Sequence, residues 1–254
     1  MISVITAVYN SEKTLLETLE SVYDQKDVSI EHIIIDGESK DQSKTIIASF
    51  INRHQGHHVT YVYLSEKDQG MYDAINKGLK LATGKIVGIL NSDDTYQHHQ
   101  VLKKIETSFH QYQVDAVYGN VNVINEKRDV IRKIRTGKFQ LGDYQRSLHP
   151  THPTFYIKKE IISQYGNYDL NYTIASDGEY MFRLLEIHKI DHHYIDEVLV
   201  VMKDGGISQS GIQSTLTIIK ETKHFMKKHH MRFSVLKYVM YKFKKIKEYK
   251  KDNL

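Results

Sequence analysis

Carboxylates follow three apolar runs in the first 95 residues: Asp36, Asp68 and the adjacent pair Asp93 and Asp94. Short runs of Val and Ile bounded by turn residues are typical of buried parallel strands. Open α/β sheets bind ligands outside the carboxyl ends of their strands, so we expect these side chains at one edge. Adjacent carboxylates repel each other unless a cation or hydrogen-bond donors compensate. The set therefore predicts a polar ligand held with a hard divalent cation, although the pair alone also fits a solvated turn.

The surrounding elements have the rhythm of an α/β fold. Four expected strands alternate with three expected helices. The strands cover 2–8, 31–35, 59–64 and 86–90, and the helices centre on 15–22, 46–50 and 72–82. This alternation indicates a parallel sheet with right-handed crossovers. Further along we expect a helix over 98–111, a hairpin of 114–124 and 130–135, a strand over 154–157, helices over 158–165 and 176–188, and a strand over 194–202.

Composition excludes several classes of site. The 254 residues are 40% hydrophobic and 26% charged, which is ordinary for a globular protein. The chain has no cysteine, so disulfides, thiolate nucleophiles and Cys-based zinc sites are excluded. We find no signal peptide and no apolar run near the roughly 20 residues of a membrane-spanning helix. No glycine-rich phosphate loop follows the first strand.

The last residues form a basic segment. Residues 223–254 contain eleven Lys or Arg but only Glu248 and Asp252 as acids, a net charge of +9 in a chain of net charge +4. From Phe233 onward, apolar residues recur every three or four positions. This pattern predicts a basic amphipathic helix on an anionic membrane surface; the alternative is a helix packed on the protein or on a dimer partner. No motif supports nucleic-acid binding.

Five segments resemble family 2 glycosyltransferases of the GT-A fold: 3–10, 34–37, 68–78, 82–84 and 90–94. The resemblance covers about residues 1–205, and it points to bacterial enzymes of exopolysaccharide or lipopolysaccharide (colanic-acid-type) biosynthesis. It implies an α/β GT-A fold, a mostly parallel nucleotide-binding sheet flanked by helices. The implied domain is 1–210, with a nucleotide-sugar half (1–95) and an acceptor half (96–210). A basic amphipathic helical extension, 211–254, would follow.

The resemblance also implies donor-side roles. Ala7, Tyr9 and Asp36 would line the nucleobase pocket, with Asp68 near the uracil or ribose. The D-x-D-type motif of the family reads Ser92-Asp93-Asp94 here, so its first position departs from the pattern. Asp94 would be the metal ligand, and Asp93 would support the ribose and the metal. The family uses Mn²⁺ or Mg²⁺ to neutralise the leaving diphosphate.

The base position of the family matches Asp177, near the start of an expected helix. In an inverting displacement the base takes the proton of the acceptor hydroxyl. Glu179 competes for this role. Residues two apart on a helix point roughly 200° apart, so only one of them can face the site. Asp177 is favoured because it matches the motif; an Asp that only caps the helix is the alternative.

Other acceptor-side candidates are weaker. His149 and His152 flank the expected acceptor site but fit ordinary loop residues as well. Residues 205–208 resemble a family loop over the donor diphosphate and equally fit a linker.

The implied activity is inverting transfer of a hexosyl group from a nucleotide sugar, UDP-linked by preference, to a saccharide or polyprenyl-linked saccharide. The expected location is the cytoplasm, peripheral to the inner face of the cell membrane, with homodimerisation left open. Two alternatives stay open: a sugar nucleotidyltransferase, and a non-catalytic nucleotide-binding scaffold of the same fold. The first would be expected to carry a glycine-rich basic loop where this chain has Asn10-Ser11-Glu12.

Overall fold

The structure, a computed structural model, describes residues 1–234 apart from 55, 57, 147, 206–211 and 232. Within these residues nine strands form one sheet in the order β3-β2-β1-β4-β8-β6-β9-β5, with β7 paired to β6. The first half of the chain contains β1 (Ile2–Val8), α1 (Leu15–Tyr23), β2 (Ile30–Asp36), α2 (Ser43–His54), β3 (Val59–Ser65), α3 (Met71–Leu81), β4 (Ile86–Ile89) and β5 (Thr95–Tyr96).

The second half begins with α4 (Val101–Tyr112) and the hairpin of β6 (Ala116–Ile124) and β7 (Val130–Ile134). Two 3-10 turns follow, η1 (Asp143–Arg146) and η2 (His152–Thr154). The remaining elements are β8 (Tyr156–Lys158), α5 (Lys159–Tyr165), α6 (Ser176–Phe182), the π-helical turn η3 (Arg183–Ile187), β9 (His192–Lys203) and α7 (Ile212–Lys228).

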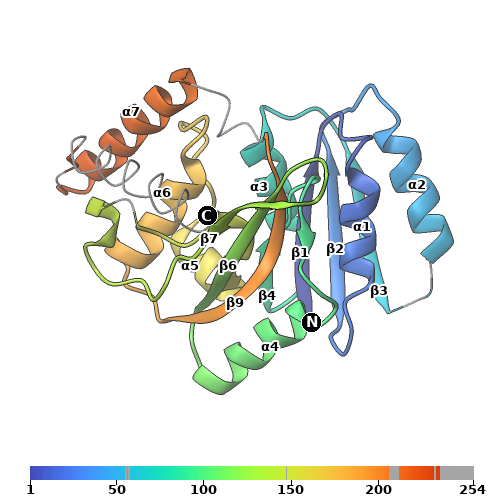
Figure 1. The fold of residues 1–254 in the computed structure, drawn as a ribbon, viewed down its shortest axis with the longest axis horizontal. Helices are drawn as coiled ribbons and strands as arrows, with labels where there is room; N and C mark the ends of the chain where they lie inside the picture. The colour runs from blue at the N-terminus through green and yellow to red at the C-terminus, as the bar shows by residue number, and fades with distance from the viewer. Residues whose placement is uncertain (55, 57, 147, 206–211, 232, 235–254) are drawn as a thin grey trace.

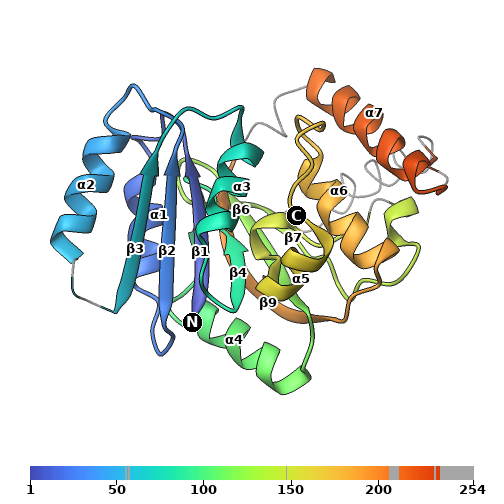
Figure 2. The same ribbon diagram turned by 180° about the vertical axis from the view of Figure 1, so that it is seen from behind.

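Strands β1 to β4 are parallel and carry helices on both faces, as the apolar runs predict. Side chains alternate between the two faces of a strand. Accordingly Ile33 and Ile35 pack with α3, whereas Ile34 packs with α1 and α2. Figures 1 and 2 show α3 on the opposite face of the sheet from α1 and α2. Both faces are therefore buried, and the carboxyl ends of these strands remain as the open edge.

The second half of the sheet is mixed. β6 and β9 are parallel, whereas β5, β7 and β8 run antiparallel to their neighbours. β8 joins the two halves by pairing with both β4 and β6. Gly88 of β4 is required at this junction, because a Cβ there would overlap the Tyr156 ring. The Tyr156 hydroxyl in turn hydrogen-bonds that of Tyr96.

The helix α7 packs on the protein. Phe225 and Met226 are buried, and the Phe225 ring lies 5.1 Å from that of Phe182 on α6. Residues 235–254, which hold most of the expected amphipathic helix, lie outside the described residues. No helix in the part of the chain that the structure describes is long and apolar enough to cross a membrane.

His32 on β2 makes the fold sensitive to acid. Its side chain is fully buried, with Nε2 3.0 Å from Thr6 Oγ1, and burial lowers the pKa of His32 from 6.5 to about 3. The unfolded chain therefore binds the proton more tightly, so stability present above pH 6.5 is lost as the pH falls toward 3. We expect a loss on the order of 2 kcal/mol in the free energy of unfolding between pH 7 and pH 5.

Denaturant unfolding across this pH range measures that loss. Glutamine has no proton to gain, so the His32→Gln protein is expected to lose much of this pH dependence. An unchanged slope in that variant would contradict the assignment to His32.

Candidate functional site

The loops after β1, β2 and β4 are tied together by hydrogen bonds. Asn10, in the left-handed conformation with φ of 51°, donates its backbone N–H to Ser39 Oγ at 2.9 Å. The hydroxyls of Ser11 and Ser92 lie 2.8 Å apart. The loop that carries Tyr9 is thus joined to the loops after Asp36 and before Asp93, and the three form one edge.

Asp36 ends β2 and is fully buried. Its Oδ2 accepts a hydrogen bond from Ser65 Oγ at 2.6 Å, and its Oδ1 accepts one from the backbone N–H of Ser39 at 3.2 Å. Lys44 Nζ lies 3.9 Å from Oδ2. Asp36 therefore joins the carboxyl ends of β2 and β3.

Asp68 lies directly over the end of β2. A Cβ added to Gly37 would overlap the Asp68 carboxylate, which also accepts the Gly70 N–H at 2.9 Å. Ala7 is partly buried and pairs in register with Ile35, and Tyr9 is 59% exposed beyond the end of β1. Four of the predicted donor-side residues, Ala7, Tyr9, Asp36 and Asp68, thus lie at or just beyond the ends of three adjacent strands.

Asp93 and Asp94 follow β4 at the same edge. Asp94 is only 1% exposed, and its Oδ2 accepts a hydrogen bond from Asn91 Nδ2 at 2.8 Å. Asp93 is partly exposed. Burial raises the pKa of both carboxyls; the neighbouring Asp93 charge raises that of Asp94 further, whereas Lys203 opposes the rise at Asp93.

This pair fits a divalent cation. The raised pKa values mean that negative charge is disfavoured here, and a bound cation would reverse that preference. Among the described residues no group of three His, Cys, Asp or Glu side chains converges on a metal position. Two carboxylates are nevertheless enough for Mg²⁺ or a similar ion when substrate phosphates and water complete its shell.

Asp177 lies against the start of α3. Its Oδ1 is 3.1 Å from the Tyr72 hydroxyl and accepts the Gly178 N–H at 2.8 Å. The same Tyr72 hydroxyl lies 2.6 Å from the Ile174 carbonyl oxygen and can donate to only one of the two at a time. Because α3 follows β3 and runs back along the sheet, Tyr72 lies at the carboxyl edge, next to the Asp68 loop. Asp177 is therefore brought to the edge that holds the other carboxylates.

Glu179 has a different environment. It is buried, and Arg183 Nε lies 2.9 Å from its Oε1 and Arg183 Nη2 3.3 Å from its Oε2. Arg183 also donates to the carbonyl oxygens of Tyr165 and Asn167. Both oxygens of Glu179 are thus held by one guanidinium, so Asp177 is the carboxylate of this helix that is available for chemistry.

The two predicted acceptor-side histidines, His149 and His152, pack against tyrosine rings. His152 is buried, and its Nε2 lies 2.8 Å from the Tyr168 hydroxyl; burial lowers the pKa of His152 and the charge of Asp177 opposes this. The Tyr168 ring stacks on that of Tyr72 at 5.8 Å. His149 stacks on Tyr144, 5.2 Å between ring centroids. His152 is therefore linked to Asp177 through tyrosines rather than by direct contact.

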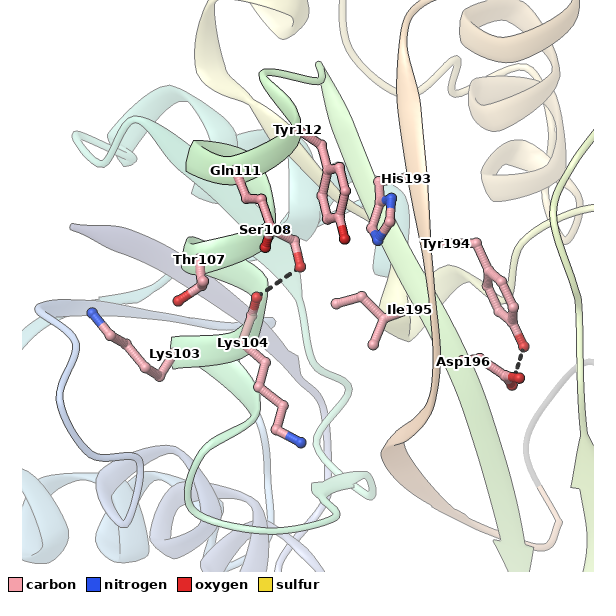
Figure 3. A pocket seen from close by; sticks show the side chains of 10 residues that line it. All are labelled: Lys103, Lys104, Thr107, Ser108, Gln111, Tyr112, His193, Tyr194, Ile195 and Asp196. Atoms are coloured by element: carbon pink, nitrogen blue, oxygen red, sulfur yellow. Dashed lines mark hydrogen bonds between the residues drawn. The ribbon is translucent and has the colours of Figure 1, made fainter.

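A depression elsewhere on the molecule does not belong to this edge. Figure 3 shows it between α4 and the start of β9, where Tyr112 and His193 stack with centroids 3.7 Å apart. This is the amino end of the parallel strands, near the N-terminus in Figure 1. It contains none of the predicted site residues.

Sequence reasoning missed Tyr72, Tyr168 and Lys203 as neighbours of the carboxylates. Tyr72 lies inside the 68–78 segment that carried the resemblance, and its position two residues after Gly70 was a usable signal. Tyr168 and Lys203 had no such signal, because their contacts depend on the packing of distant elements.

A family model described as glycosyl transferase family 2 matches residues 3–168. The chain belongs to this family. A relative, the PGL/p-HBAD biosynthesis glycosyltransferase of Mycobacterium bovis (strain BCG / Pasteur 1173P2), is 25% identical over 215 residues, 83% of this chain and 80% of that protein. An uncharacterised glycosyltransferase of Mycobacterium tuberculosis is 30% identical over 193 residues, 72% of this chain and 68% of that one. The predicted family is confirmed.

Solved structures agree on the fold. Staphylococcus aureus TarS, residues 1–349 in complex with UDP-GlcNAc, has a TM-score of 0.67 at 18% identity, covering 89% of this chain and 66% of that chain. The mannosyltransferase PcManGT of Pyrobaculum calidifontis, in complex with GDP-Man and Mn²⁺, has a TM-score of 0.65 at 18% identity, covering 90% and 63%. This chain thus spans about two thirds of each. The likeness confirms the predicted GT-A fold.

Proposed function

We propose that this glycosyltransferase is inverting and metal-dependent and moves a hexosyl group from a UDP-sugar to a saccharide or polyprenyl-linked saccharide during cell-surface polysaccharide synthesis. The observation that carries the proposal is the contact of Tyr72 with Asp177, which brings a carboxylate without a cationic partner among the described residues to the edge holding Asp36, Asp68 and the Asp93-Asp94 pair. The bound UDP-GlcNAc of TarS and the GDP-Man and Mn²⁺ of PcManGT support a nucleotide-sugar donor and a metal.

On the donor side, Ala7, Tyr9, Asp36 and Asp68 would bind the nucleoside, with carboxylate oxygens accepting from the uracil N–H and the ribose hydroxyls. Asp93 and Asp94 would hold Mn²⁺ or Mg²⁺, which would neutralise the charge of the leaving diphosphate. Asp93 is the more exposed of the two, and the enclosed Asp94 is fixed by Asn91.

On the acceptor side, Asp177 would take the proton of the attacking hydroxyl. As the acceptor oxygen bonds to the anomeric carbon, the bond from that carbon to the phosphate oxygen breaks and the nucleoside diphosphate leaves. Attack from the face opposite the leaving group inverts the anomeric centre. Tyr72 and the Gly178 N–H hold the carboxylate in place.

The decisive experiment is a donor screen that follows nucleotide release. UDP-glucose, UDP-galactose, UDP-GlcNAc and GDP-mannose are each tested with saccharide acceptors, with Mn²⁺ and with a chelator. We expect release from a UDP-sugar that the chelator abolishes. Consumption of a nucleoside triphosphate and a sugar phosphate instead would identify a nucleotidyltransferase. Absence of turnover together with absence of heat on mixing with UDP and Mn²⁺ would contradict the proposal.

The Gly37→Ala variant tests the donor side. The added methyl group must displace the Asp68 carboxylate, the end of a flexible side chain, so the cost to stability is small. We expect the KM for the donor to rise about tenfold, equivalent to about 1.4 kcal/mol, with kcat nearly unchanged. Steady-state kinetics measure this. Because the methyl group acts by displacing Asp68, Gly37→Ala should change the donor KM little in a protein that already carries Asp68→Ala. An equal rise of KM in both backgrounds would contradict a role of Asp68 in donor binding.

Residues 223–254 supply a second part of the proposal, contact with an anionic membrane that would bring the enzyme to a lipid-linked acceptor. The support is their net charge of +9 and the apolar spacing from Phe233 onward. Co-sedimentation with vesicles is the test. Binding to phosphatidylglycerol vesicles but not to phosphatidylcholine vesicles, lost on removal of residues after 234, is expected. A concentration-dependent dimer with no vesicle binding would support the dimer alternative instead.

A further inference from the structure

Glu221 of α7 makes a concentrated set of contacts with the segment just before α6. Its Oε1 accepts hydrogen bonds from the Thr173 backbone N–H at 2.8 Å and the Thr173 hydroxyl at 2.6 Å. Its Oε2 accepts the N–H groups of Ile174 at 3.1 Å and Ala175 at 2.8 Å. One carboxylate thus holds three consecutive residues of backbone.

This held segment leads directly to Asp177. Ile174 also contacts Tyr72 through its carbonyl oxygen, and α6 begins at Ser176. Ala175, the residue before α6, offers no side-chain oxygen to the free N–H groups at this end of the helix. From another helix, Glu221 accepts the N–H of Ala175 itself and those of the two residues before it. The segment is therefore fixed on one side by α3 and on the other by α7.

The helix that carries Glu221 is itself anchored. Phe225 and Met226 are buried one turn further along, and the Tyr172 hydroxyl lies 3.2 Å from His224 Nδ1. Lys228 Nζ lies 3.9 Å from the Asp169 carboxylate. Burial alone would raise the pKa of Glu221, but the hydrogen bonds from Thr173, Ala175 and Ile174 lower it below its ordinary value. The carboxylate thus stays charged, and charged acceptors form the stronger hydrogen bonds.

We propose that Glu221 is a positioning residue for Asp177: from α7 it fixes residues 173–175 and thereby the place of the base at the sheet edge. The proposal rests on the role of Asp177 in the proposed function. If Glu221 has this role, α7 contributes to catalysis by positioning the base. The proposal is supported by the hydrogen bonds that join the 173–175 segment to Glu221 of α7 and to Tyr72 of α3.

The Glu221→Ala variant tests the proposal. Without the carboxylate the segment loses four hydrogen bonds, and we expect kcat to fall about 10- to 100-fold while the donor KM stays within about twofold. The matched control is Lys220→Ala, the exposed neighbour on the same helix, which is expected to leave both constants unchanged. Melting temperatures are recorded so that kcat is compared at equal folded fraction.

A double-mutant cycle separates positioning from general support. Tyr72→Phe removes the hydroxyl that contacts both the Ile174 carbonyl oxygen of this segment and Asp177 itself. If both residues act on one geometry, the double variant loses less activity than the product of the two single losses. Multiplicative losses, or a kcat of Glu221→Ala equal to that of the parent, would overturn the proposal.

Hydrogen exchange gives a readout that needs no substrate. In Glu221→Ala the amides of residues 173–175 are expected to exchange faster, whereas those of α4 keep their rates. Unchanged exchange at 173–175 would overturn the proposal that Glu221 fixes this segment. Failure of the parent protein to release nucleotide from any donor overturns the proposed function, so the two failures are distinguishable.

Discussion

Replacing Asp177 by asparagine is expected to lower kcat by about 10²- to 10⁴-fold while the donor still binds. Asparagine keeps the shape of the side chain and the acceptor oxygen that faces Tyr72 and the Gly178 N–H. It cannot take a proton from the acceptor hydroxyl. Single-turnover nucleotide release measures the chemical step, and calorimetry with UDP and Mn²⁺ measures donor-side binding separately.

Comparison with Glu179→Gln shows which of the two carboxylates is the base. The substitution removes the charge that pairs with Arg183 in a buried position, so the free energy of unfolding should fall by on the order of 2 kcal/mol. Its kcat at equal folded fraction should stay near the parent value. The reverse pattern, an active Asp177→Asn enzyme and an inactive Glu179→Gln enzyme, would transfer the base role to Glu179.

Replacing Asp94 by alanine is expected to abolish metal-dependent turnover. Asp94 is the enclosed member of the pair; its burial, together with the charge of Asp93 beside it, raises its pKa well above the ordinary range. Without a cation, this carboxyl is costly to ionise, so its removal should not destabilise the metal-free protein. Nucleotide release as a function of Mn²⁺ concentration measures the loss.

Thermal unfolding checks the same assignment without substrate. A cation that binds only the folded chain raises its melting temperature. The increase produced by Mn²⁺ with UDP should vanish in Asp94→Ala and persist in Asp24→Ala, which removes an exposed carboxylate at the end of α1. An equal increase in both variants would remove Asp94 from the metal site.

The framework of this fold could be predicted because its signals are local. Parallel strands buried on both faces require continuous apolar runs, and the helices between them require apolar residues every three or four positions. The 72–82 helix and the strand ending at Leu90 were accurate for this reason. The two-residue strand β5 carries no such period and was missed, whereas the residues of η3 were predicted as part of the helix over 176–188 without its π-helical geometry.

The site could be predicted only in part, for the same reason. Asp36, Asp68 and Asp94 could be placed at this edge because each lies at or shortly after the end of a strand: Asp36 ends β2, and the other two lie in the loops after β3 and β4. Their roles stay predictions. The contact of Tyr72 with Asp177 joins residues 105 positions apart. Asp177 and Glu179 have different partners, as expected for residues two apart on a helix, but the pairing of Glu179 with Arg183 depends on how α6 packs. The role proposed for Glu221 could not be predicted either, since Glu221 belongs to the segment 211–254 that the sequence pattern presented as a basic extension, and its partners, residues 173–175, lie far away in the sequence.

The position of β8 between β4 and β6 has a consequence for how the chain folds during synthesis. β4 is the edge of the parallel half until Tyr156 and its neighbours arrive, and an apolar edge strand is a template for wrong pairing. The first half of the chain is therefore synthesised before the strand that covers β4, and β4 has no partner on that side until then. Pairing with β8, where the Tyr156 ring lies against Gly88, gives β4 its second neighbour. We therefore expect the two halves of the chain to fold as one cooperative unit rather than one after the other.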